Sequence, residues 1–435
     1  MTTVDQLPKL LQWLFGEEAN QLAHATGFIQ RERKWSGARF AQTLVFGWME
    51  QPAASLSQLQ QTAWECGCGV SIKNVSTRLS EVEATAFMQA LLEKALQATV
   101  YQDKPSGITG LPFEQVVLLD STQVSLPLEL AVQWPGGGNQ NRARAGMKVQ
   151  VVYEWQQGRL SLSVHPAVTH DCKLTPLQLS AGSLVVHDSG FLSVARCQSY
   201  EQAQLYWLAR VSGQMGVMDE QGKYYTLASY LQQQAPETAL DRWIYLTHQG
   251  HPVRLIALPL PPDVVQTRRE RLRADNLRRR GCEPSLDSLI LCQWCVLATN
   301  VPLERLTSEQ ALLLYRSRWQ IELLFKLWKQ EGRLDEWRSQ NLNRIQTELY
   351  AKLLMLLVQH WLLVETCWQF MDRSLVKAVH RLRRYVPALI GALSTPHLLS
   401  ALLTHIADGM TLCRVRKRRK RPAFFQSLEV FSLAS

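Results

Sequence analysis

The stretch from Tyr315 to Lys329 constrains the fold of this chain more than any other part of the sequence. At about 100° per residue, its leucines, Phe325 and Trp328 cover one wide side of a helix. A helix this apolar is largely buried, so its narrow polar stripe must face a partner. The stripe consists of Tyr315, Arg318, Trp319, Glu322, Lys326 and Lys329. One carboxylate among cations and aromatic rings favours a phosphodiester strand with a metal ion above it. The alternative is a solvated face with i,i+4 ion pairs.

Two further acids stand where a metal site needs them. Asp120 follows the apolar run Val116–Leu119, and Asp188 follows Leu184–His187. Short β-branched runs of this kind predict buried strands. An acid at the carboxyl end of a buried strand opens into the crevice of an α/β sheet, where ligands bind. The alternative for each aspartate is a turn residue or the N-cap of the next helix.

Together these motifs resemble the DDE transposases of the IS4 family, the group that includes the Tn5 and Tn10 transposases. The family pattern Tyr-x2-Arg-x3-Glu-x6-Lys matches Tyr315, Arg318, Glu322 and Lys329 in spacing. Asp120-Ser-Thr and Asp188-Ser-Gly-Phe resemble the contexts of its first and second catalytic acids. The resemblance covers about residues 110–345 and is looser on either side.

The resemblance implies a catalytic triad of Asp120, Asp188 and Glu322 that binds two Mg²⁺ ions, with Mn²⁺ as a substitute. Mg²⁺ takes oxygen ligands and leaves room for water and phosphate. Asp120 is expected to bridge the two ions. The residues expected to contact DNA are Tyr315, Arg318, Lys329, Lys326, Arg338, Arg210 and Trp294. Trp294 resembles the family tryptophan that stacks on a flipped base; a core position is the alternative.

The fold expected from this resemblance is α/β. It is an RNase H-like catalytic core with a β-rich insertion, flanked by helical N- and C-terminal regions. The five expected parts are a helical DNA-binding region at 1–105, the first part of the core at 106–212, the insertion at 213–305, the second part of the core at 306–345, and a helical dimerisation region with a basic tail at 346–435.

Composition agrees with a polyanionic partner. The chain has 47 Lys and Arg against 37 Asp and Glu, a net charge of +10, although anionic membrane surfaces also attract such a chain. The start has no secretion signal, and the apolar stretch Leu353–Val364 is too short to span a bilayer. The odd, scattered cysteines predict a reducing cytosol, and the pairs Cys66/Cys68 and Cys292/Cys295 lack the ligands of a zinc site. Together with the resemblance, this predicts a bacterial cytoplasmic protein that is associated with the nucleoid and does not bind a membrane.

Four further segments carry weaker signals. Ser55–Cys66 and Ser71–Leu79 predict a helix-turn-helix with Lys73, Asn74, Ser76, Thr77 and Arg78 in a major groove, or an ordinary helical hairpin. Pro135–Gly146 predicts a flexible basic loop that contacts DNA, or a plain disordered loop. Thr267–Arg280 predicts a cationic arm or helix that favours phosphate contacts over a merely solvated surface. Arg414–Arg421 is a basic tail suited to DNA.

The sequence thus predicts a transposase that moves an insertion sequence by cut-and-paste, through metal-dependent phosphodiester hydrolysis and strand transfer, with hairpin ends. Its expected partners are transposon-end DNA, target DNA and a second copy of the chain in a homodimeric synaptic complex. Two alternatives stay open: an RNase H-like DNA endonuclease without strand transfer, and a non-enzymatic DNA-binding descendant of a transposase. Clustered acids near DNA phosphates argue against the second alternative, because a pure binder has no use for them.

Overall fold

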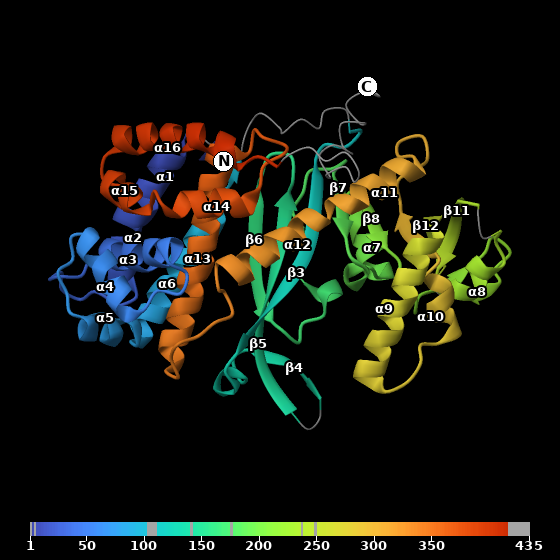
Figure 1. The fold of residues 1–435 in the computed structure, drawn as a ribbon, viewed down its shortest axis with the longest axis horizontal. Coiled ribbons are helices and arrows are strands. Elements are labelled where there is room, and N and C mark those ends of the chain that lie inside the picture. Colours follow the sequence, from blue (N-terminus) through green and yellow to red (C-terminus); the bar gives the residue numbers. More distant parts are fainter. Residues whose placement is uncertain are drawn as a thin grey trace. The chain divides into compact units, whose positions relative to one another are not determined.

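Side-chain caps set where several helices begin. Ser55 and Thr307 each form a capping box with a glutamine three residues later, at the starts of α4 (Leu56–Glu65) and α11 (Ser308–Ser317). Ser71 and Asn341 cap α5 (Ile72–Leu79) and α13 (Leu342–Cys367) by accepting a backbone N–H. With strands between these helices, the chain has a mixed α/β fold (Figure 1).

The computed structural model describes residues 2–3, 6–101, 111–139, 142–174, 177–235, 238–247 and 250–415. The chain divides into two units. The first comprises Met1–Leu111, Ser121–Thr169 and Gln320–Ser435, and the second comprises Pro112–Asp120 and His170–Trp319.

The second unit is built on a mixed sheet. Its strand order is β10 (Tyr224–Thr226), β9 (Gly216–Met218), β11 (Leu240–Leu246), β12 (His251–Pro259), β13 (Trp294–Thr299), β8 (Tyr206–Arg210), β7 (Leu184–His187) and the first half of β3 (Val116–Leu126). Strands β3, β7 and β8 are parallel, and the remaining pairs in this unit are antiparallel. Helix α11 packs on β7 and β8, and α7 (Val194–Gln202) packs on β8. The helices α8 (Leu227–Gln232), α9 (Pro262–Arg280) and α10 (Leu286–Leu291) complete the unit.

The first unit combines a helical core with a small antiparallel sheet. The sheet contains the second half of β3, β5 (Arg142–Glu154), β4 (Pro135–Asn139) and β6 (Leu160–Pro166). Its helices are α1 (Leu7–Trp13), α2 (Ala19–Ala25), α3 (Gly37–Glu50), α4, α5, α6 (Val82–Gln97), α12 (Trp319–Lys326), α13, α14 (Leu375–Arg383), α15 (Val386–Ala392) and α16 (Pro396–Met410). A short parallel pair, β1 (Thr2–Thr3) and β2 (Val100–Tyr101), also belongs here.

Helix α13 is the core of the first unit. It is buried along nearly all of its 26 residues and contacts α3, α6 and α16 (Figure 1). By length and composition it could cross a membrane, but its most apolar window is entirely buried inside the protein. The described structure therefore gives α13 the place of a core helix.

Several predicted elements differ from the structure. Strand β3 does not end at Asp120 but runs on to Leu126, because the residues after Asp120 alternate between buried and exposed, as in a half-buried strand. Pro135–Gly146 is not a loop: β4 and β5 pair as antiparallel strands there, and residues 140–141 lie outside the described part. The apolar pattern of Leu289–Thr299 also predicts a strand, but this segment begins within helix α10, which Ser285 caps, and becomes a strand only at Trp294.

The predicted helix from Tyr315 to Lys329 is also interrupted. Arg318 is a turn residue between α11 and α12, and a π-helical turn follows at Leu327–Glu331. The apolar side is buried as expected except for Leu323, which is 38% exposed. Ser71–Leu96 forms two helices, α5 and α6. Helix α15, which begins with Pro387 in its first turn, was not predicted. The basic tail lies outside the described residues from 416 onward.

Candidate active site

The register of two parallel strands brings Asp120 and Asp188 side by side. Strand β3 pairs with β7 so that Leu119 lies opposite His187, and each aspartate is the next residue along its chain. Adjacent strands lie about 4.8 Å apart, and residues in the same register point to the same face. Asp188 caps the short helical turn Ser189–Phe191 by position, but its side chain makes no capping bond. Its carboxylate is therefore not used as a helix cap.

Helix α11 delivers two side chains to these carboxylates. The Arg318 Nη1 lies 3.1 Å from Asp120 Oδ2, and the side chains of both residues are 17% exposed. The Tyr315 hydroxyl donates to Asp188 Oδ1 at 3.4 Å. Burial raises the pKa of Tyr315 to about 12, with Asp188 adding to the effect and Arg318 and Arg210 opposing it. The phenol therefore stays protonated and remains a donor at neutral pH.

A group of arginines extends from these residues across the second unit. Arg210, exposed at the end of β8, exerts its charge on Tyr315 and also on the Cys295 thiol. Burial raises the pKa of Cys295, while Arg268, Arg210 and Arg316 all oppose that rise. These three arginines form the cationic cluster of the second unit.

Trp294 begins strand β13 and is only 3% exposed. Its carbonyl accepts a hydrogen bond from Arg268 Nη1 at 3.1 Å. An indole buried to this degree would have to leave its place to stack on a base. The base-stacking role stays a prediction.

The remaining predicted site residues belong to the first unit. Glu322 lies in the first turn of α12 and is partly buried, and Lys326 is exposed in its last turn. Lys329 lies in the π-helical turn, and Arg338 is exposed after it. The convergence of Glu322 with the two aspartates stays a prediction. Among the described residues, no group of three or more His, Cys, Asp and Glu side chains is placed to hold a metal ion.

The two aspartates nevertheless fit a hard divalent cation. Neighbouring carboxylates offer only oxygen donors, which are the ligands that Mg²⁺ prefers. Arg318 lies on one oxygen of Asp120, so a cation held there would share that carboxylate with the guanidinium. His187 does not add a nitrogen ligand: its ring is fully buried against Phe191, Tyr200 and Trp207.

Sequence reasoning missed the residue that positions α11. Arg254, in β12, is 1% exposed and binds Asp241 through two hydrogen bonds of 2.7 and 2.6 Å. Its Nη1 also donates to the carbonyls of Val301 and Leu306, at 3.1 and 2.7 Å, in the loop that leads into α11. The available signal was a lone arginine inside an otherwise apolar strand, because buried arginines are almost always paired.

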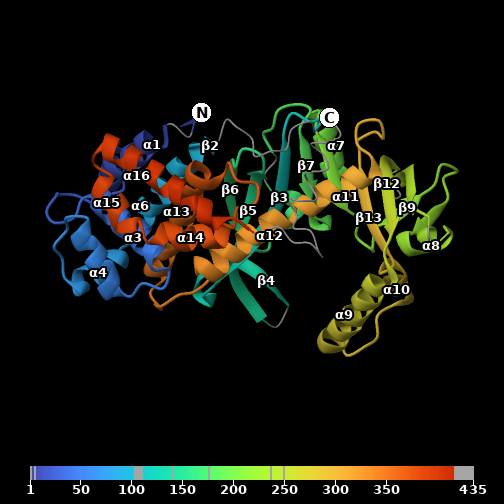
Figure 2. The same ribbon diagram turned by 45° about the horizontal axis from the view of Figure 1, so that its top comes forward.

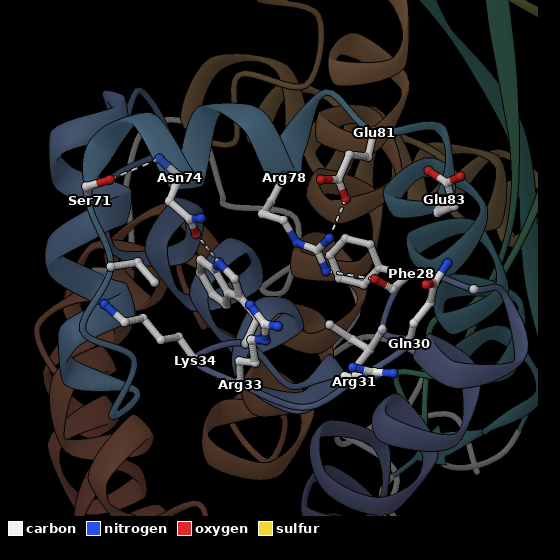
Figure 3. Close-up of a pocket in the computed structure, with 14 residues that line it drawn as sticks. Phe28, Gln30, Arg31, Arg33, Lys34, Ser71, Asn74, Arg78, Glu81 and Glu83 are labelled. Carbon is white, nitrogen blue, oxygen red and sulfur yellow. Dashed lines mark hydrogen bonds and ion pairs between the residues drawn. The ribbon is translucent and has the colours of Figure 1, made fainter.

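The N-terminal helices of the first unit contain a separate basic pocket of about 820 Å³ (Figure 3). It lies between the loop Gly27–Trp35 and α5. Its charged lining consists of Arg31, Arg33, Lys34, Arg78, Glu81 and Glu83. Arg78 donates to Glu81 at 2.6 Å and to the Phe28 carbonyl at 2.7 Å, and Trp35 Nε1 donates to Asn74 Oδ1 at 2.5 Å. Asn74 and Arg78, both expected to face a major groove, thus form hydrogen bonds within the protein, although Asn74 is exposed, as are Lys73 and Thr77.

The sequence model of the transposase DDE domain matches residues 111–358, which is more than half of the chain and includes Asp120, Asp188 and Glu322. The chain belongs to the DDE transposase family. Similar proteins include the transposase for insertion sequence element IS231E of Bacillus thuringiensis subsp. finitimus. It is 26% identical over 381 residues, covering 78% of each chain.

Two further relatives of this DDE transposase are also bacterial. The transposase for IS231B of Bacillus thuringiensis subsp. berliner is 25% identical over 367 residues, covering 78% of this chain and 75% of the relative. The transposase for IS421 of Escherichia coli is 25% identical over 361 residues, covering 78% of this chain and 88% of the relative. All three relatives are named as transposases of bacterial insertion sequences.

Proposed function

We propose that this protein is the transposase of an insertion sequence and moves it by cut-and-paste. The reaction is metal-dependent hydrolysis of phosphodiester bonds at the element's ends, followed by strand transfer into target DNA. The observation that carries the proposal is the parallel register of β3 and β7, which sets Asp120 beside Asp188 and beneath Arg318 and Tyr315. The relatives named as insertion-sequence transposases support it.

In this proposal the carboxylates of Asp120, Asp188 and Glu322 would hold the Mg²⁺ ions. Bound divalent ions would ease the loss of a proton from the attacking water or 3′-hydroxyl and would supply positive charge to stabilise the leaving oxygen. Glu322 follows Arg318, which bonds Asp120, by only four positions in the chain, and this short link supports Glu322 as the third acid. The protein need supply no covalent nucleophile.

The side chains around the acids bind and orient the DNA. In this proposal Arg318, Tyr315 and Arg210 donate to the oxygens of a phosphate held at the aspartates, and the bonds of Arg318 and Tyr315 to Asp120 and Asp188 support this. Tyr315 donates as a neutral phenol, and Arg318 donates through its planar guanidinium. The proposed contacts from the first unit are Lys326, Lys329 and Arg338.

The remaining parts of the proposal come from the family resemblance. They are an RNase H-like core interrupted by a β-rich insertion, hairpin ends stabilised by Trp294, a synaptic homodimer, and location on the bacterial nucleoid. The mixed sheet with flanking helices supports such a core. In the N-terminal region, the basic pocket between Gly27–Trp35 and α5 is consistent with binding of transposon ends.

The test is Mg²⁺-dependent cleavage of a supercoiled plasmid that carries the element's own ends. We compare the wild type with Glu322→Gln and Asp188→Asn, and with Glu304→Gln as the matched control at an exposed acid. We expect cleavage to be lost in the first two variants and kept in the control, with end binding unchanged in all. Equal cleavage by Glu322→Gln would remove Glu322 from the site.

The same assay separates the alternatives. Cleavage without joined products would favour an endonuclease that does not transfer strands. Specific end binding without cleavage by any of the proteins would favour a non-enzymatic descendant. Hairpin-ended products would establish the hairpin route.

A further inference from the structure

Helix α9 of the second unit is a basic arm that the chemistry of the two aspartates does not use. Seven of its 19 residues are arginine, and none of its side chains is buried. Figure 2 shows α9 and α10 extending away from strands β12 and β13. A helix that is polar on all sides gains nothing from core packing, so its sequence must be explained by propensity, charge or a partner.

Only the first arginines of the arm hold it in place. Arg268 Nη1 donates to the Trp294 carbonyl at 3.1 Å, and Arg269 Nε donates to the Leu289 carbonyl at 3.4 Å. The arginines farther along are exposed: Arg271, Arg273, Arg278, Arg279 and Arg280. Arg273 and Arg278 have acidic neighbours, at 3.7 Å from Glu283 and 2.7 Å from Asp275. Exposed pairs of this kind contribute little to stability, so the fold does not require them.

Interaction with the helix dipole accounts for only part of this charge. Cations in the last turn stabilise a helix through its dipole, which is a reason for Arg278, Arg279 and Arg280. It does not explain Arg271, which lies in the middle of the helix. The three acids of α9 leave it with four excess positive charges, a surplus complementary to a polyanion.

The arm is continuous with the candidate active site. The positive charge of Arg268, at the base of the arm, opposes the rise that burial causes in the pKa of the Cys295 thiol, as do the charges of Arg210 and Arg316. Arg210 in turn acts on Tyr315, whose hydroxyl bonds Asp188. Cations therefore run from the aspartates to the base of α9 without leaving the second unit. A phosphate backbone that crosses the aspartates can follow this track onto the arm.

We infer that α9 lies along the phosphate backbone of duplex DNA and holds it, independently of base sequence, beyond the bond that is cut. From Arg268 to Arg280 the helix rises about 18 Å, at about 1.5 Å per residue. Duplex DNA rises about 3.4 Å per base pair, so the arm spans about five base pairs. The position relative to the cut rests on the proposed function, whereas binding to duplex DNA does not.

A native cysteine allows a direct test of this path. Cys282 lies just past the end of α9 and is the only exposed cysteine among the described residues. An iron chelate attached to its thiol generates hydroxyl radicals that cut nearby DNA. The probes are a duplex spanning the element's end with its flank, and an unrelated duplex offered as target. The control is Cys282→Ser, taken through the same labelling.

We expect cuts that depend on Cys282 and centre about five base pairs or slightly more from the scissile phosphate. Cuts at a fixed position on the end duplex identify the element's end or flank as the DNA on the arm. Cuts that arise only on the unrelated duplex identify target DNA on the arm and overturn its position beyond the bond that is cut. No cuts that depend on Cys282, on either duplex, would overturn the inference.

A charge series gives an independent test. If the exposed arginines at the tip each neutralise one phosphate, replacing Arg278, Arg279 and Arg280 by Gln lowers the slope of log affinity against log salt by up to about 2.7. Replacing all three by Lys keeps the slope. An equal loss of slope in the Lys and Gln variants, or no loss in the Gln variant, would contradict a charge contact.

Plasmid cleavage is read in the same samples. If the wild type gives cuts that depend on Cys282 but no Mg²⁺-dependent cleavage, the proposed function fails and the arm's DNA contact stands. If the wild type cleaves the plasmid and gives no such cuts, the inference about α9 fails and the proposed function stands.

Discussion

The buried imidazole of His360 makes the stability of the first unit depend on pH. His360 lies on α13 and is 2% exposed, and its Nε2 donates to the Gly158 carbonyl at 2.7 Å. Its other ring nitrogen is buried without a hydrogen-bond partner in the described structure. Burial lowers the pKa of His360 from 6.5 to about 4, while the bond to Gly158 opposes the shift. The ring is therefore neutral in the folded protein at pH 7.

Acid then favours the unfolded chain. Below pH 6.5 the unfolded histidine binds a proton, but the folded one resists protonation until about pH 4. The contribution of His360 is thus fully present above pH 6.5 and is lost as the pH falls toward 4. At about 1.4 kcal/mol per pKa unit, the loss reaches about 3 kcal/mol in the free energy of unfolding.

The variant His360→Gln isolates this effect. Its amide N–H can still reach the Gly158 carbonyl, but the side chain does not titrate. We expect the variant to be less stable at pH 7 by about 1–3 kcal/mol, because ring packing against Tyr153 and Trp368 is lost. Between pH 7 and pH 4, the stability difference between wild type and variant should shrink by about 3 kcal/mol, because all other titrating groups cancel.

The measurement is hydrogen–deuterium exchange of the α13 amides at several urea concentrations and pH values, which reports on the first unit alone. The intrinsic exchange rate of each peptide is measured on the unfolded chain at the same pH and is used to correct the rates of the folded protein. If the wild type and the variant lose stability in parallel as the pH falls, His360 is not held neutral by burial and the reasoning is wrong.

Three further outcomes follow from the described contacts. Asp241→Asn leaves the buried Arg254 without its charged partner and should destabilise the second unit by about 3–5 kcal/mol in urea unfolding, with a smaller effect from the exposed Asp287→Asn. Tyr315→Phe removes the hydroxyl that bonds Asp188 and should slow plasmid cleavage about fivefold to tenfold. The pH profile of cleavage should be the same for wild type and variant below pH 10, because the phenol is neutral there; an alkaline inflection present in the wild type and absent from the variant would refute this. Lys352→Met leaves the buried Glu348 without its ion-pair partner and should lower the free energy of unfolding by about 3–5 kcal/mol, measured by thermal unfolding. Adding Glu348→Leu should restore most of that stability.

The predicted strands show what a sequence pattern can and cannot give. The apolar runs before Asp120 and Asp188 located β3 and β7, because burial on both faces leaves a continuous apolar signal. The sequence pattern does not predict the continuation of β3 past Asp120, because apolar and polar residues alternate there. Over so few residues, such alternation is hard to distinguish from a loop. The glycines of Pro135–Asn139 hid β4 in the same way, since glycine lacks strand propensity and the pairing with β5 comes from tertiary context.

Contacts between distant residues were beyond the pattern. Tyr315 and Arg318 were expected to bind phosphate, but in the structure they also bond Asp188 and Asp120. Asn74 was expected to read DNA, yet it accepts a hydrogen bond from Trp35, far away in the sequence. Polar side chains identify a chemistry by type, whereas their partners depend on how the chain folds back.

The two aspartates share a face only because of the register between β3 and β7. Side chains alternate along a strand, so a slip of one residue would turn Asp120 away from Asp188. The side chains of Leu118 and Leu119 and of Val185 and Val186 are all buried, so a slip would disturb packing on both faces of the sheet. His187 adds a further constraint, because its buried ring bonds the Asp188 carbonyl at 2.9 Å and packs against Trp207 of the next strand. The apolar core is thus what sets the acids side by side, and the position of a candidate metal site follows from residues that never touch it.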